Sequence, residues 1–298
     1  MISLRYHLVT IVAVFLALAL GLLAGSSFGQ PALVDQLRGR TDVQLARIDE
    51  LRAEVEAADA RTAALDAFAA DAYGYLVPGR LIGTRVVVVT QEGLPAALES
   101  SVLEALEDAG ARILLTVALQ PDLVAVEGSA AEARDAALAI TAPEDPVAAT
   151  AAALGERFAA AVAPVAAGDD VLARLVSAGL IAARDGSLDE EVRLQVAGEL
   201  AVVVLGGSDD AQLPLTSEVA SRLLDALLAN GARLAACAGS SPEDAVWLDG
   251  VTDRSAVTVA AADSPSGATA LVLGLRSLLD TGEGGAYGGD GAGLPPLA

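Results

Sequence analysis

The chain begins with an apolar segment that contains no charged side chain. This run extends from Leu8 to Ala24 and starts just after Arg5 and His7. As a helix it rises about 26 Å, and the uncharged flank Gly25 to Phe28 extends it toward the hydrocarbon thickness of a bilayer, about 30 Å. The pattern therefore predicts an N-terminal membrane anchor in residues 1–29, in contact with membrane lipid.

The charges on either side of this segment predict its orientation. The amino terminus and Arg5 precede the apolar run, whereas Asp35 comes before Arg38 and Arg40 on the far side. Basic residues close to a span favour the cytoplasmic side. We expect a single-pass protein of the cell membrane, with a cytoplasmic N-terminus and an extracytoplasmic C-terminal domain. The small residues Ala24 to Ser26 also suit a cleavable secretion signal, so cleavage remains an alternative.

Residues 30–74 repeat apolar side chains at heptad spacing. The pattern predicts a long helix that reaches about 60 Å and has the seam of a coiled coil. It stops near Gly74, and Pro78-Gly79 forms the following turn. The seam positions are Val34, Leu37, Thr41, Gln44, Ile48, Leu51, Val55, Ala58, Thr62, Leu65, Ala69 and Ala72.

The charges beside this seam leave its partner open. In a parallel homodimer Arg47 faces Arg52 of the second helix, and Glu54 faces Asp59. Exposed like-charge pairs cost only a few tenths of a kcal/mol each. A homo-oligomer, an envelope protein partner and packing on the chain's own folded domain are therefore all compatible with the heptad.

From residue 75 to 280 apolar runs of strand length alternate with helical patterns. This alternation predicts an α/β domain with a mainly parallel sheet of about five strands. The expected strands are Arg85 to Thr90, Arg112 to Val117, Leu200 to Leu205, Arg233 to Ala238 and Ser255 to Ala261.

The expected helices lie between and around these strands. Residues 121–194 are Ala-rich and predict several short helices, one of them with a capping box at Ser129 and Glu132. Another short helix is expected from Ser241. The Gly- and Pro-rich tail, residues 281–298, is expected to lack regular structure. The longer helices are expected at Pro95 to Asp108, Thr216 to Asn230 and Pro265 to Asp280.

The charge and the rarity of some residue types exclude several functions. The net charge of −22 argues against nucleic acid as a partner, because phosphate binding needs clustered Lys and Arg. All 18 basic residues are Arg, which excludes a phosphate-loop or Schiff-base lysine. His7 is the only histidine, so the folded domain lacks a Ser/His/Asp arrangement. We expect no enzymatic activity, no catalytic residue and no resident cofactor.

Three loops are expected beyond the carboxyl ends of the parallel strands, where such sheets bind ligands. They are Glu92-Gly93, residues 206–210 and Gly239 to Ser241. In the second loop Asp209 and Asp210 follow two glycines and are weak candidates for a hard cation. The simpler interpretation is a solvated loop that leads into the next helix.

Two further residues are weak metal-ligand candidates. Cys237 ends an apolar strand, where a lone cysteine is commonly a small buried hydrophobe. His7 is positioned to meet a cation at the membrane surface, but an interfacial role beside the anchor is the simpler and favoured interpretation.

The order of segments resembles the actinobacterial copper-transporter family. The resemblance lies in Ser3 to His7 running into Val12 to Gly21, in the heptad helix, in Leu81 to Val86, and in Gly285 to Gly288 of the tail. It implies a membrane-attached protein of the cell envelope that functions in copper homeostasis as a channel or transport component. It also allows an outer-membrane location.

The residues present supply few copper ligands of their own. Copper(I) favours Cys and Met, and copper(II) favours imidazole, yet the chain has one Cys, one Met and one His. The resemblance does not identify a set of copper-binding residues in this chain. We therefore expect a copper transport or homeostasis component without a strong copper site of its own. The alternative is an envelope scaffold that presents an acidic α/β domain to a protein partner, and an anchored enzyme is the least supported function.

Overall fold

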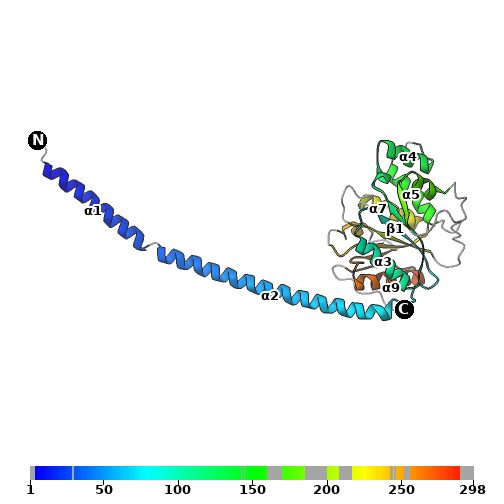
Figure 1. Ribbon diagram of the computed structural model, residues 1–298, viewed down its shortest axis with the longest axis horizontal. Helices are drawn as coiled ribbons and strands as arrows, with labels where there is room; N and C mark the ends of the chain where they lie inside the picture. Colours follow the sequence, from blue (N-terminus) through cyan, green and yellow to red (C-terminus); the bar gives the residue numbers. More distant parts are fainter. Residues whose placement is uncertain are drawn as a thin grey trace. The chain divides into compact units, whose positions relative to one another are not determined.

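The computed structural model describes residues 4–28, 30–141, 143, 145–159, 170–184, 200–207, 217–241, 244, 246–251 and 256–288. The chain divides into two compact units, Met1–Leu65 and Asp66–Ala298. Helix α1 (Leu4–Phe28) and most of helix α2 (Gln30–Leu76) belong to the first unit, and the last turns of α2 open the second (Figure 1).

The first unit contains the predicted apolar helix. Within α1, residues Tyr6–Ala24 are long and apolar enough to cross a membrane, and every one of them is exposed. A secretion signal has the same length and composition, so both interpretations of this segment stay open. The heptad stretch is helical from Gln30 to Leu76, slightly beyond its predicted bounds.

The second unit is built on one twisted sheet. Among the described residues it has seven strands in the order β3-β2-β1-β4-β5-β6-β7. All neighbours are parallel except β2 and β3, which are antiparallel. The strands are β1 (Arg85–Gln91), β2 (Arg112–Leu119), β3 (Ile181–Arg184), β4 (Leu200–Leu205), β5 (Arg233–Cys237), β6 (Val257–Val259) and β7 (Gly285–Tyr287).

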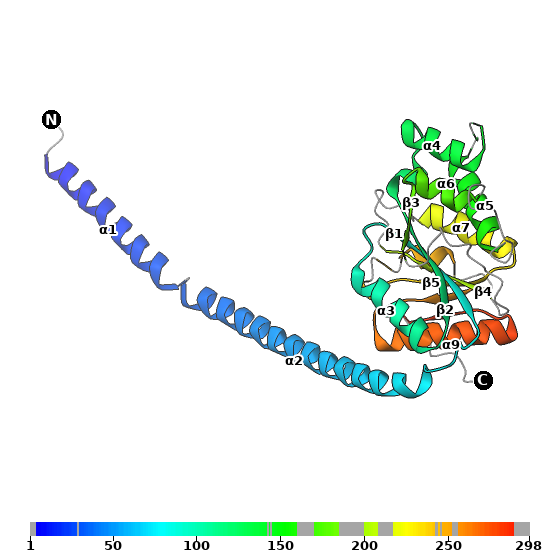
Figure 2. The same cartoon turned by 45° about the vertical axis from the view of Figure 1, so that its right-hand side comes forward.

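Helices cover both faces of this sheet, as Figures 1 and 2 show. Helices α3 (Ala96–Asp108) and α9 (Pro265–Thr281) pack on one face, and α5 (Pro146–Ala159) and α7 (Ser217–Ala229) pack on the other. The described residues also form helices α4 (Ser129–Leu138) and α6 (Val171–Ser177) and the short 3₁₀ turns η1 (Pro121–Val124) and η2 (Val246–Gly250).

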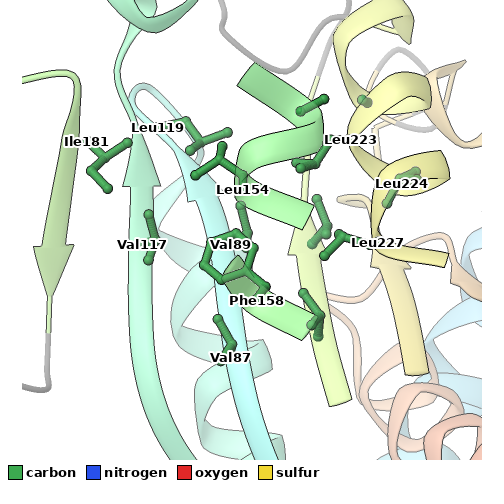
Figure 3. Close-up of a cluster of buried hydrophobic side chains, with 14 of the residues drawn as sticks. Val87, Val89, Val117, Leu119, Leu154, Phe158, Ile181, Leu223, Leu224 and Leu227 are labelled. Atoms are coloured by element: carbon green, nitrogen blue, oxygen red, sulfur yellow. The ribbon is translucent and has the colours of Figure 1, made fainter. Parts of the chain in front are cut away.

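The central strand β1 contributes to both cores. Val87 and Val89 belong to the cluster on the α5 and α7 side, where Leu154 and Phe158 pack beside them (Figure 3). The alternate residues Val86 and Val88 belong to the cluster on the α3 and α9 side. A strand buried on both faces needs a continuous apolar run, and this explains why the pattern predicted β1 and β4 well.

The sheet has two more strands than the sequence predicted. β3 lies in the stretch predicted to form several short helices and no strand, so that prediction is wrong at Ile181–Arg184, which pairs with Thr116 to Leu119. β7 lies in the tail that was expected to lack regular structure, and Gly285–Tyr287 pairs with β6. Both are short edge strands, and the neighbouring strand overrides the local preference of Ala and Gly residues.

The helix termini show one side-chain cap and contradict a predicted one. At α9, the hydroxyl of Ser264 accepts a hydrogen bond from Gly267 N at 3.1 Å, as expected at an N-cap. At α4 the predicted capping box does not form, because Gly128 occupies the N-cap position with φ 92° and Ser129 is already helical. The short helix expected from Ser241 lies mostly outside the described residues.

A buried ion pair joins α5 to the start of α6. Arg157 Nη2 lies 2.6 Å from Asp170 Oδ2, and the two side chains are only 13% and 10% exposed. The same carboxylate caps α6 by accepting a hydrogen bond from Leu172 N at 2.9 Å. Burial alone would raise the pKa of Asp170, but the hydrogen bonds from Arg157 and Leu172 N outweigh it and hold the pKa below its usual value.

Replacing Arg157 by Gln is expected to lower the free energy of unfolding by about 3 kcal/mol at pH 7, because the carboxylate stays buried without its partner. Since the folded-state pKa of Asp170 is depressed, this stabilisation is present above the unfolded value of about 3.9 and is lost as the pH falls through the folded value. The difference between wild type and variant should shrink below about pH 4. Urea denaturation followed by the fluorescence of Trp247, the sole tryptophan, measures it.

Arg276→Gln is the matched control for this measurement. Arg276 pairs with Asp280 on the surface of α9, where the two side chains are 39% and 33% exposed. Its loss should cost less than about 1 kcal/mol. Equal effects of the two substitutions would contradict a stabilising role for the buried pair.

Candidate functional site

The carboxyl edge of the sheet brings together loops that the sequence analysis singled out. Strands β1 and β4 are neighbours, and the chain leaves them in opposite directions across the sheet, which is the switch point where open α/β sheets bind ligands. A Cβ at Gly207, after β4, would lie 3.5 Å from both Gln91 Nε2 and Leu94 Cδ1, at the end of β1. The segments that follow β1 and β4 therefore lie beside one another at this edge of the sheet.

Asp244 occupies the space between the ends of β4 and β5. Its Oδ2 lies 2.9 Å from where a Cβ at Gly239 would stand, and its Oδ1 lies 3.6 Å from the corresponding position at Gly207. The glycines thus leave room for this carboxylate. Asp244 was not predicted as a site residue, and the only local signal was a glycine one or two residues after the end of each of the two strands.

Trp247 covers the first glycine after β4. Its side chain is 1% exposed, and a Cβ at Gly206 would lie 2.5 Å from Cε2 of the indole. Such a distance is too short for any real contact, so the ring packs directly on the glycine backbone. An indole and a carboxylate of the chain itself therefore lie at the switch point, at the place where a glycine turn in other folds admits a phosphate.

Two of the four metal-ligand candidates lie in the part of the chain that the structure describes, and they belong to different units. Asp209 and Asp210 lie outside the part of the chain that the structure describes. His7 is an exposed residue of α1 in the first unit. Cys237 ends β5 in the second unit and is fully buried. Within the described ranges, no three His, Cys, Asp or Glu side chains converge to hold a metal ion.

Burial determines the chemistry of Cys237. The thiol belongs to the core cluster on the α3 and α9 side, and burial raises the pKa of Cys237 far above its ordinary value. Metals and electrophiles react with the thiolate, which this environment disfavours. The residue therefore packs as a small apolar side chain in the folded unit.

A second candidate site is an acidic pocket of about 220 Å³ beside the last turns of α2. The Tyr73 hydroxyl donates to Asp108 Oδ2 at 2.9 Å. Burial and then this hydrogen bond raise the pKa of Tyr73, which keeps the phenol protonated. The pocket is suited to a cationic or hydrogen-bonding group. It is lined by Ala70, Tyr73, Ser101, Glu104, Asp263, Pro265 and Ala268.

Comparison with known proteins identifies the family of this chain. The family described as "Copper transport outer membrane protein, MctB" matches residues 1–295. The chain belongs to this family. The resemblance predicted from the sequence is thereby confirmed, and a membrane-compatible N-terminal helix accompanies it.

Individual relatives match over a shorter region. Proteins named "Copper transporter MctB" from Mycobacterium tuberculosis and Mycobacterium bovis are 33% identical to this chain over 132 residues. The matched region covers 44% of this chain and 41% of each relative. The match thus spans less than half the length of these relatives.

The packing of Trp247 on Gly206 generates a direct test. Gly206→Ala should lower the free energy of unfolding by about 2 kcal/mol, because the methyl group must displace a buried indole. Gly207→Ala is the matched control, since its Cβ would meet only ordinary contacts, and it should change stability by about 0.5 kcal/mol or less. Urea denaturation measures both, and only Gly206→Ala should shift the native fluorescence of Trp247. Indistinguishable variants would contradict the packing.

Proposed function

We propose that this member of the MctB family is a membrane-anchored component of copper transport or homeostasis in the cell envelope. The observation that supports it most directly is the family match over residues 1–295, which includes the apolar helix α1 as well as the α/β unit. The relatives named copper transporters add support in the matched region. We further propose that the chain handles copper as cargo, without catalysis.

The proposed orientation places the N-terminus in the cytoplasm and the α/β unit outside it. Arg5 precedes the exposed apolar stretch of α1, and basic residues close to a span stay on the cytoplasmic side. The acidic charge of −22 also suits a domain that stands away from anionic lipid.

Protease added to intact spheroplasts is expected to degrade the α/β unit, because under this topology the unit faces the added enzyme. Immunoblotting against a C-terminal tag measures the loss, and a cytoplasmic protein that survives in the same sample is the control. Complete protection of the tag until the membrane is broken would contradict the topology.

The proposed handling of copper does not depend on a strong site in one chain. Selective copper binding needs several Cys, Met or His donors together, and this chain has one of each. Cys237 is buried as a protonated thiol, and His7 belongs to the other unit. We propose that a partner protein, or a second copy that supplies another His7, completes the set of donors.

Copper(I) competition against a chromophoric chelator tests this proposal on the purified full chain in detergent, at a concentration where it is monomeric. The monomer is expected to take no copper from a chelator of high affinity, and Cys237→Ser should behave like wild type. A stoichiometric high-affinity site in the monomer would contradict the proposal of shared donors and indicate direct binding.

An envelope scaffold is the second candidate, supported by exposed apolar residues along α2 that suit a protein partner. Cellular copper content separates the two functions. A strain that lacks the protein should accumulate copper if it is a transport or homeostasis component, and restoring the gene should reverse this. Unchanged copper content together with loss of a bound envelope protein would favour the scaffold.

A further inference from the structure

Helix α2 exposes large apolar side chains along the part that lies in the first unit. Ile48 and Leu51 are each 43% exposed, Val55 is 58% exposed and Leu65 is 67% exposed. All four occupy heptad seam positions. A water-exposed helix gains nothing from such a stripe, so the exposure indicates a partner that covers it.

The spacing of the stripe specifies the shape of that partner. The seam repeats every 3.5 residues on average, which is the period of helices that pack along each other's length. A helix lying on a globular surface needs a wider apolar face instead, at a period of 3.6 residues. The surface that covers these four residues is therefore another helix of matching period.

We propose that this partner is α2 of a second copy of the chain, aligned in parallel and in register. The proposal rests on the proposed function, because it takes α1 as an anchor in the membrane. Two copies inserted in one membrane leave it in the same direction, which gives their α2 helices a parallel arrangement at equal height. Gln44 at a seam position adds register specificity, since a polar seam residue is best matched by its own counterpart.

The charges beside the seam permit this pairing, because its two like-charge contacts, Arg47 with Arg52 and Glu54 with Asp59, lie on exposed flanks where repulsion is weak. Arg47 of one copy faces Arg52 of the other, but each is already paired with an acid on its own helix. Arg47 Nη1 lies 2.6 Å from Glu50 Oε2, and Arg52 Nη1 lies 3.4 Å from Asp49 Oδ1. These pairs reduce the repulsion between the two arginines.

Other seam and flanking residues predict how tight the pair is. Two heptads after Arg47, Arg61 faces Asp66 of the second copy, which is an attractive pairing. Ala58 and Thr62 bury little apolar area, so contact is concentrated at Ile48, Leu51 and Val55. The geometry points to a reversible dimer whose strongest contact is close to the middle of α2.

Cysteine cross-linking of the full chain in native membranes tests both the partner and its direction. Single substitutions Ile48→Cys, Leu51→Cys and Leu65→Cys place a thiol at three heights of the seam. In a parallel, in-register pair each thiol lies close to its own counterpart, so a mild oxidant should yield a disulfide-linked dimer in all three variants.

Two controls make this result specific. Ala53→Cys places the thiol on the side of the helix opposite the seam and should give at most one tenth of the dimer that Leu51→Cys gives. The unsubstituted chain reports on Cys237, which is buried and should give none. Cross-linking of only one of the three seam variants would indicate an antiparallel pair. Cross-linking of none would indicate that a different protein covers the seam. Either result overturns the proposal. No copper chemistry enters the readout, so failure here is distinct from failure of the copper proposal.

A charge substitution tests the same pair by affinity. Arg52→Glu replaces two Arg–Arg pairings with two Glu–Arg pairings in the symmetric dimer and should lower its dissociation constant about fivefold. Ala53→Glu adds a charge away from the seam and should leave the constant within about twofold. Analytical ultracentrifugation of the full chain in detergent measures both. An unchanged or weaker dimer for Arg52→Glu would show that Arg47 and Arg52 do not face each other and would overturn the parallel register.

Discussion

Burial of strand β1 on both faces is the constraint on which the second unit depends. The strand lies between β2 and β4, and Val86 to Val89 are at most 3% exposed. Successive side chains of the strand point to opposite faces of the sheet and so enter two separate cores, one under α5 and α7 and the other under α3 and α9. The same central place makes the carboxyl end of β1 the switch point of the sheet, which explains why Gln91 and Gly207 meet there.

The central strands could be predicted from sequence because double burial leaves a strong local signal. β1 and β4 are unbroken Val-rich runs, and such runs require a sheet covered on both sides. The edge strands leave no comparable signal. Ile181–Arg184 contains two alanines, and Gly285–Tyr287 has one large residue, so both become strands only because β2 and β6 present unpaired backbone groups. Pairing at a sheet edge depends on the assembled sheet, so the local sequence of the edge segment does not predict it.

The candidate site, too, could be predicted from sequence only in part. The glycines after β4 and β5 could be located from sequence, because strand ends and Gly residues are local features. Asp244 and Trp247 could not, since nothing near them in sequence indicates that they return to Gly206, Gly207 and Gly239. The acidic pocket depends on three helices meeting, and its residues Tyr73, Glu104 and Asp263 are distant in sequence. Asp209 and Asp210 lie outside the described residues and stay a prediction.

The exposed seam of α2 offers a way to compensate for the scarcity of copper donors in one chain. One chain has a single imidazole, His7, near the start of α1, and its only thiol, Cys237, is buried in the core on the α3 and α9 side. In the proposed parallel, in-register pair, with α1 as the proposed anchor, the two His7 residues would lie at the same level of the membrane, and the pairing would double the imidazoles at one depth. Copper(II) accepts imidazole ligands, and two convergent donors bind a metal far better than one. Self-association through α2 is thus a physical means by which a chain with few donors could take part in copper transport.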